Sequence, residues 1–221
     1  MTPFWDPFLL SLQLAAVTTV LLLIIALPIC YGIFFYSNRS TPILKSLVSL
    51  PLVLPPTVLG YYLLIAFRPE GLLANIIPGT NLAFSFEGLV AGSIIFSFPF
   101  MANPILSALE STSKNLTQAA FTLGKSKFET FFYVLLPNIK PSVIIGAVMA
   151  FAHTIGEFGM VLMIGGNIPD ETRVASIAIY NEVEKMSYAN ADLYALVLLF
   201  FSMVVLLFIY GFQYQQKAKL F

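Results

Sequence analysis

Glu157 has the clearest chemical consequence in this sequence, because it is the only acid placed deep in a long apolar segment. An ionised carboxylate at the centre of a membrane span costs roughly 3 kcal/mol on insertion scales. Glu157 must therefore face other protein or a water-filled path, or be protonated. His153 lies one helical turn earlier on the same face, and we expect the two side chains to form a hydrogen-bonded pair. A gating role fits this position, and so does a packing role with hydrogen bonds to neighbouring backbone.

Catalysis and metal binding have little support elsewhere in the chain. One Cys (Cys30) and one His allow no disulfide and no metal site built from several Cys or His residues. A proton relay or a membrane enzyme would need further clustered ionisable groups, which one His and scattered acids do not provide. No GxxxxGK[ST] phosphate-binding loop occurs, so any ATP would be bound by another chain. We predict no catalytic residue, no metal ligand and no cofactor in this protein.

The composition predicts an all-α integral membrane protein. Of the 221 residues, 58% are hydrophobic and 10% are charged, and the mean hydropathy is +0.88. Soluble domains carry about 25% charged residues, and a water-exposed globule of this size could not bury so much apolar surface. The same figures exclude disordered tails and nucleic-acid binding. The balance of 11 basic and 11 acidic residues steers the chain to no charged partner.

Five segments are long and apolar enough to span a bilayer, which requires roughly 20 residues. They are 8–36, 44–67, 88–109, 141–165 and 191–212. Prolines are expected to break helices in the second and third segments, namely Pro51, Pro55, Pro56, Pro99 and Pro104. Glycines are expected to mark close helix packing at Gly60, Gly92, Gly146, Gly156 and Gly159. Before the last segment, residues 172–186 could form a short helix.

The basic residues predict the orientation, because cytoplasmic loops are enriched in Lys and Arg. One side of the membrane receives eight of the 11, namely Arg39, Lys45, Lys114, Lys125, Lys127, Lys140, Lys217 and Lys219. The other side receives Arg68, Arg173 and Lys185. The first side is therefore predicted to be cytoplasmic. A multi-pass protein of the plasma or inner membrane follows, with its N-terminus outside and its C-terminus in the cytoplasm.

The predicted cytoplasmic segment 110–140 is patterned rather than loop-like. Apolar or small residues recur at helical spacing at Leu116, Ala119, Ala120 and Leu123, and Gly124 can end that helix with a positive φ. A second apolar face follows at Phe128, Phe131, Phe132 and Leu135, before Pro137 and Pro141 mark the start of the fourth span. The pattern predicts a short amphipathic helix, a turn and a second helix lying against the membrane. The paired alanines favour close approach of another surface over contact with lipid headgroups.

This segment resembles the Glu-Ala-Ala loop of type I ABC importer permeases, on the spacing of Ala119-Ala120, Gly124 and Val134-Leu-Leu-Pro137. In that family the loop is the coupling helix, which docks in a groove of a cytoplasmic ATPase. The resemblance implies a coupling loop over 111–140. Its implied ATPase-coupling residues are Leu116, Thr117, Gln118, Ala119, Ala120, Thr122, Leu123, Gly124, Leu136 and Pro137. Gln118 stands where the family usually has Glu, so length is kept and a charge is lost.

Other stretches are similar to molybdate permeases. They are the run from Leu50 to Gly60, Gly156-Glu-Phe-Gly159, Gly166-Asn-Ile-Pro-Asp-Glu-Thr-Arg173 and Ile177-Ala-Ile-Tyr180. The resemblance covers about 8–212 and implies a single permease domain over 1–221, with about five spans of the type I importer fold. It also implies a homodimer in the lipid bilayer, two ABC ATPase subunits that hold ATP and Mg, and an extracytoplasmic substrate-binding protein. The implied substrate is molybdate or a related tetrahedral oxyanion, since sulfate and tungstate permeases share parts of the pattern.

A weak passage, rather than a tight oxyanion site, is expected within the spans because none carries a Lys or Arg in its middle. The residues expected to line or gate it are Pro55, Pro56, Thr57, Ser97, His153, Thr154 and Glu157. Direct contact of Glu157 with an anion is disfavoured by like-charge repulsion. His153 stands where the family pattern has an Arg. A stand-alone secondary transporter is the alternative, and it predicts more intramembrane charges and no docking helix.

Overall fold

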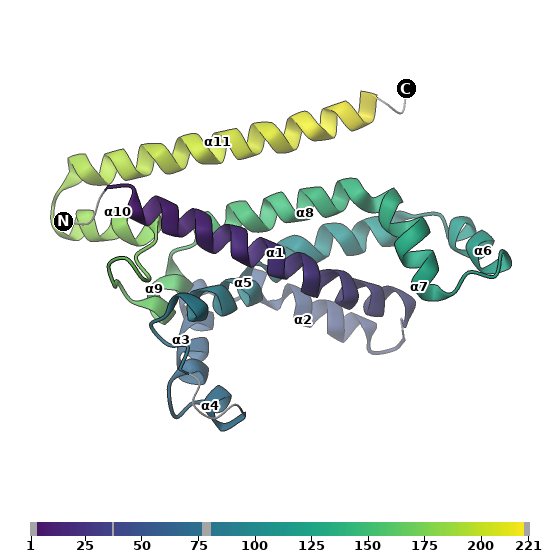
Figure 1. Ribbon diagram of the computed structural model, residues 1–221, viewed down its shortest axis with the longest axis horizontal. Helices are drawn as coiled ribbons and strands as arrows, with labels where there is room; N and C mark the ends of the chain where they lie inside the picture. Colours follow the sequence, from purple (N-terminus) through teal and green to yellow (C-terminus); the bar gives the residue numbers. More distant parts are fainter. Residues whose placement is uncertain (1–3, 37, 77–80, 219–221) are drawn as a thin grey trace.

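The computed structural model describes residues 4–36, 38–76 and 81–218, with side chains as far as Gly211 (Figure 1). The regular structure of this part of the chain is helical throughout, as the composition predicts. In chain order the helices are α1 (Asp6–Phe35), α2 (Thr41–Val53), α3 (Pro56–Phe67), α4 (Leu72–Ile76), α5 (Phe86–Ser111), α6 (Lys114–Thr122), α7 (Lys127–Glu129), the π-helix η1 (Thr130–Leu135), α8 (Leu136–Gly156), α9 (Gly159–Gly165), α10 (Ala175–Glu184) and α11 (Tyr188–Ala218).

Five spans are present among the described residues when one bent pair of helices is counted as a single span. Four continuous stretches are long and apolar enough to cross a bilayer: Asp6–Phe35, Phe86–Ser111, Lys127–Gly156 and Tyr188–Gly211. The predicted first, third and fifth spans match these within a few residues. The short helix predicted within 172–186 is also confirmed, as α10.

The second predicted span is broken. α2 meets the stretch that begins at Pro56 at an angle of 108°. Leu54 and Pro55 are extended, with ψ of 135° and 133°, because each precedes a proline that disfavours the helical conformation. The predicted break at Pro55 and Pro56 is therefore confirmed. The breaks predicted at the single prolines were wrong, since Pro51 lies inside α2 and both Pro99 and Pro104 lie inside α5.

The fourth span differs from the predicted 141–165 at both ends. It begins earlier, because α7, η1 and α8 continue into one another from Lys127 to Gly156, so Pro137 and Pro141 lie within this helix rather than at the start of the span. The π-helical pattern supplies the reason, since the Leu136 N–H bonds Phe131 O, five residues back, and Pro137 follows within the first turn of α8. It also ends earlier, at Gly156, and the residues after Phe158 form the separate helix α9.

α5 lies at the centre and packs against α1 and α8. One buried cluster, which includes Met101, Ile105, Leu109 and Phe131, lies toward the end that carries α6. A second, which includes Leu89, Met160 and Ile164, joins α5 to α9. Several glycines permit these approaches, because a Cβ at Gly60, Gly92, Gly146 or Gly159 would lie within 3.1 Å of a neighbouring helix. The packing prediction was wrong only for Gly156, where a Cβ would meet nothing within 4 Å.

Candidate functional site

α6 is a short helix with a defined end, as predicted. Gly124 has a φ of +80°, which favours glycine. Its N–H donates to Phe121 O at 2.9 Å and the Lys125 N–H donates to Ala120 O at 3.0 Å, the two bonds of a Schellman motif. α7 then begins with a capping box, in which Ser126 Oγ accepts from the Glu129 N–H and Glu129 accepts from the Ser126 N–H. The Ser-x-x-Glu spacing at 126–129 is a sequence signal for this start.

The two faces of α6 differ. Ala120 is only 4% exposed and α6 packs on η1, whereas Leu123 is 81% exposed. The outer face of α6 consists of the exposed residues Gln118, Ala119, Thr122 and Leu123. The expectation that Ala119 and Ala120 form one small-residue surface was wrong, because successive helical residues point about 100° apart. A partner approaching α6 would meet Ala119, and Ala120 supports the helix from beneath.

The remaining predicted coupling residues lie beside this face rather than in it. Leu116 and Thr117 are half-buried on the side toward the bundle. Leu136 is also half-buried and packs against the cluster that contains Phe131 and Leu135, and Pro137 is exposed in the first turn of α8. Leu136 therefore helps to anchor the end of η1, on which α6 packs.

Three of the residues predicted to line a passage are brought together between α5 and α8. Ser97 Oγ lies 3.0 Å from His153 Nδ1 and 3.0 Å from Thr154 Oγ1. The Phe100 ring stacks on the His153 ring with centroids 3.9 Å apart. Ser97 and Thr154 are buried and His153 is half-buried. Ser97 is distant in sequence from its two partners, so only the tertiary structure reveals this cluster.

Glu157 lies at the point where α8 stops, with an extended backbone of ψ 135°. Its side chain is 5% exposed, and neither carboxylate oxygen has a hydrogen-bond partner among the described residues. Ser93, on α5, interacts with the carboxyl group without the geometry of a full hydrogen bond. The predicted pair with His153 is absent because the helix ends at Gly156, which removes the i, i+4 geometry. The carboxyl oxygens accept no hydrogen bond from the described backbone either, although the backbone carbonyl of Glu157 accepts from Ser176 Oγ.

The two helix breaks meet, and we call residues 55–57 and 157–159 the paired break. A Cβ added to Gly159 would lie 3.1 Å from Pro56 Cβ and 3.4 Å from Thr57 Cγ2. α3 and α9, which begin at these breaks, pack along each other and lie side by side in Figure 1. Pro55, Pro56 and Thr57 are exposed, so this junction opens at the surface of the chain.

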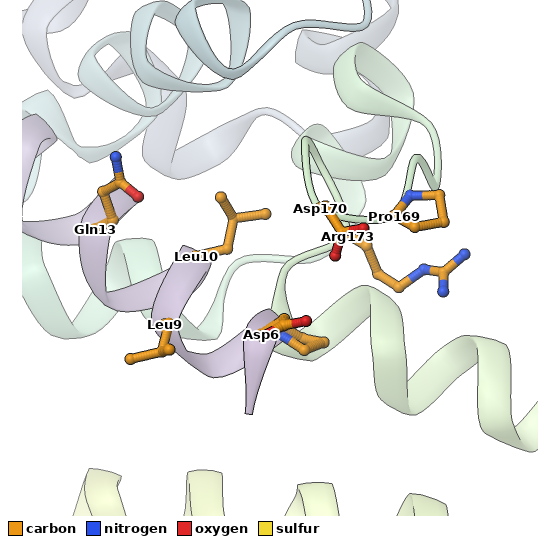
Figure 2. A pocket seen from close by; sticks show the side chains of 8 residues that line it. Asp6, Leu9, Leu10, Gln13, Pro169, Asp170 and Arg173 are labelled. Carbon is orange, nitrogen blue, oxygen red and sulfur yellow. The ribbon is translucent and has the colours of Figure 1, made fainter. Parts of the chain in front are cut away.

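A pocket that the sequence did not predict lies at the opposite end from α6. Figure 2 shows this outer pocket between the start of α1, with Asp6, Leu10 and Gln13, and the loop that carries Asp170 and Arg173. Its volume is about 350 Å³. The guanidinium of Arg173 is held by Asn167, to whose side-chain and backbone oxygens it donates. Its two walls are far apart in sequence and give no local signal.

Residues 23–220 match the family of binding-protein-dependent transport system inner membrane components, and the chain belongs to this family. It is thus the multi-pass membrane permease subunit of an ABC importer, a transport subunit and not an enzyme. It is 43% identical over 205 residues to the molybdenum transport system permease protein ModB of Azotobacter vinelandii, with 91% of each chain covered. It is 31% identical to the probable sulfate transport system permease protein cysT of Chlorella vulgaris, with 93% of this chain and 78% of that relative covered.

The fold is also that of a solved importer. The crystal structure of a bacterial alginate ABC transporter, in complex with an alginate pentasaccharide-bound periplasmic protein, matches with a TM-score of 0.75. The match covers 92% of this chain and 76% of that chain at 17% sequence identity, so it bears on the fold alone. The predicted importer permease fold is confirmed by this likeness and by the family match.

Glu157→Gln is expected to insert and assemble normally but to lower substrate uptake by about tenfold. The amide keeps the size of the side chain but cannot ionise, so the paired break gains no charge when water reaches it and the closed arrangement of the two breaks is favoured. Uptake per permease in reconstituted vesicles measures the effect, and Glu171→Gln, at an exposed acid of the outer loop, is the matched control. Normal uptake by Glu157→Gln would show that the charge has no part in transport.

Proposed function

We propose that this permease imports molybdate in an ATP-driven, binding-protein-dependent system. The observation that supports the substrate is the 43% identity to a molybdenum transport permease over 91% of both chains. Sulfate is the second candidate because of the 31% identical relative, and tungstate has the same tetrahedral oxyanion chemistry. The hydroxyl groups of Ser93, Ser97 and Thr154, which are buried near the proposed course of the substrate, support a path that makes only brief contacts with it.

The proposed path follows the paired break and the neighbouring polar cluster of Ser97, His153 and Thr154. The exposed Thr57 offers its hydroxyl group and its backbone N–H as donors where the helix is interrupted, whereas Pro55 and Pro56 have no N–H and interrupt the helix without donating. Glu157 acts as a gate when the break opens and water reaches its carboxyl group, because the carboxylate formed there repels an anion and stops it from remaining at the break. Capture of the substrate is left to the substrate-binding protein.

The proposed coupling element is the outer face of α6. In a homodimer, two such faces would each dock on one ABC ATPase subunit, and ATP with Mg would be bound by those subunits. Closure of the ATPases on ATP would draw the two α6 helices together and turn the path from inward-facing to outward-facing. Ala119 suits the centre of the docked surface, since a small side chain lets the backbone approach closely, and Gln118 supplies a neutral hydrogen-bonding rim.

The proposed docking region for an extracytoplasmic substrate-binding protein includes the outer pocket. Asp6, Asp170 and Arg173 place charges of both signs around it, and the Asn167 contacts hold the Arg173 guanidinium in one place. The alginate transporter with the same fold is complexed with its periplasmic protein. Fixed charges around the pocket would determine how the substrate-binding protein is oriented and how fast it associates with the permease, more than how tightly it binds.

The experiment that tests this function is uptake into vesicles that contain the permease, its ATPase and its substrate-binding protein. Molybdate, tungstate and sulfate are compared at equal concentration, with ATP and with a non-hydrolysable analogue. ATP-dependent accumulation of molybdate in preference to sulfate supports the proposal. Preferential uptake of sulfate favours the second candidate, and uptake without ATPase or ATP contradicts an importer of this class.

The proposed orientation places α6 in the cytoplasm and the outer pocket outside. Arg39, Lys45, Lys114, Lys125, Lys127 and Lys140 lie at the α6 end, and Arg68, Arg173 and Lys185 lie at the other. The side chain of Lys217 and all of Lys219 fall outside the described part of the chain. In a Cys30→Ala background, Asn115→Cys should react with an impermeant maleimide only from the cytoplasmic side, and Asp170→Cys only from outside. The reverse pattern would overturn the orientation.

A further inference from the structure

Two adjoining cavities extend along α1, α2 and α5. The first, which we call the apolar groove, has a volume of about 580 Å³ and is lined by Ile29, Gly32, Leu47 and Phe98 among other apolar residues. The second, the basic pocket, has a volume of about 390 Å³ and lies at the α6 end, with Lys45, Lys114, Thr117 and Gln118 in its wall. Ile33 lines both cavities, so the groove meets the pocket at this residue.

The basic pocket carries a net positive charge. Lys45 forms an ion pair with Glu110, which ties α2 to the end of α5. Lys114 has no carboxylate partner among the described residues, so its ammonium group is free to meet a ligand. Two ammonium groups therefore face one carboxylate, and hydroxyl and amide groups of Thr117 and Gln118 lie beside them. This combination suits a phosphate group held at the membrane surface.

We propose that the two cavities hold one phospholipid with an anionic headgroup, its acyl chain in the apolar groove and its phosphate in the basic pocket. A free anion would leave the apolar groove empty, whereas a lipid fills the apolar groove with its acyl chain and the basic pocket with its phosphate. Only the choice of membrane leaflet rests on the proposed function: in the orientation given above, the lipid belongs to the cytoplasmic leaflet. Because Thr117 and Gln118 belong to α6, the bound headgroup supports the helix proposed to meet the ATPase.

Lipid binding is measured by native mass spectrometry on the full-length permease in detergent, titrated with dioleoyl phosphatidylglycerol or dioleoyl phosphatidylcholine. Wild type is expected to bind phosphatidylglycerol roughly tenfold more tightly than phosphatidylcholine. Lys45→Gln with Lys114→Gln should abolish this preference. Lys140→Gln is the matched control, because Lys140 is an exposed lysine on α8 outside the pocket, and it should keep the preference.

A second variant tests the groove without touching the charges. A Cβ at Gly32 would meet nothing within 4 Å, so Gly32→Leu should fold and fill the groove. Binding of both lipids should then fall by about tenfold. Equal lipid binding by all variants would overturn the proposal. Displacement of phosphatidylglycerol by millimolar inorganic phosphate would also overturn it, because the site would then bind a free anion. A disulfide between two chains through Leu47→Cys, in a Cys30→Ala background, would overturn it as well, because a second copy of the chain would then cover the groove. These binding measurements need neither ATPase nor substrate, so their failure is separate from failure of molybdate uptake.

Discussion

Ala119→Asp should abolish co-purification of the ATPase with the permease while leaving the permease folded in the membrane. Ala119 is exposed at the centre of the outer face of α6, so the new carboxylate is solvated until a partner covers it. Once covered, an unpaired buried charge costs about 3 kcal/mol or more, which weakens the complex on the order of a hundredfold. The measurement is ATPase recovered per permease in detergent, together with substrate uptake in reconstituted vesicles.

Three further variants separate docking from folding. Ser111→Asp adds the same charge at the exposed end of α5, off the outer face of α6, and should recover ATPase normally. Ala120→Asp should lower the yield of the permease itself, because Ala120 is buried beneath the helix. Gly124→Val strains a residue with φ +80° and should resemble Ala119→Asp by misaligning α6. If the Ala119→Asp variant recovers as much ATPase as wild type, the outer face of α6 is not part of the docking surface.

Gly60→Leu should reduce uptake at least tenfold with insertion and ATPase binding retained. Even a Cβ at Gly60 would lie 2.8 Å from Met163 Cβ and 3.0 Å from Met160 Cα, and a backbone atom cannot move aside alone. α3 must therefore separate from α9, which re-aims both halves of the paired break. Overpacking of this kind costs about 1–3 kcal/mol, too little to unfold a span but enough to displace the proposed gate.

The control for this substitution is Gly211→Leu, since a Cβ at Gly211 meets nothing within 4 Å. Uptake by the two variants is compared at equal amounts of permease in the membrane. Wild-type uptake by Gly60→Leu would mean that the packing of α3 on α9 is not needed for transport. Loss of membrane insertion would place the effect in folding, and Gly60→Ala would then be used, because it adds only the clashing Cβ.

Local signals in the sequence predicted much of this molecule. The spans follow from apolar length, the break at Pro55–Pro56 from two adjacent prolines, and the end of α6 from Gly124. The predictions failed where contacts between elements of the folded protein determine which side chains meet or are buried. The α8 backbone stops at Gly156 and separates His153 from Glu157, Ser97 reaches His153 across the bundle, and η1 decides that Ala120 rather than Ala119 is covered. Periodicity places residues on a face but does not say which neighbour that face meets.

The uninterrupted helix from Lys127 to Gly156 has a mechanical consequence. Its 30 residues at about 1.5 Å each make a rod about 45 Å long, with the segment next to α6 at one end and Glu157 just beyond the other. A turn at Pro137 would have allowed the two parts to move independently, whereas a continuous helix transmits both tilt and rotation from one end to the other. The number of residues in this helix therefore sets the rotation of one end relative to the other. Each residue gained or lost within η1 would rotate one end relative to the other by about 100° and shift it along the axis by about 1.5 Å. The length of the π-helical segment thus fixes the angle between the end of this helix next to α6 and the paired break at its other end.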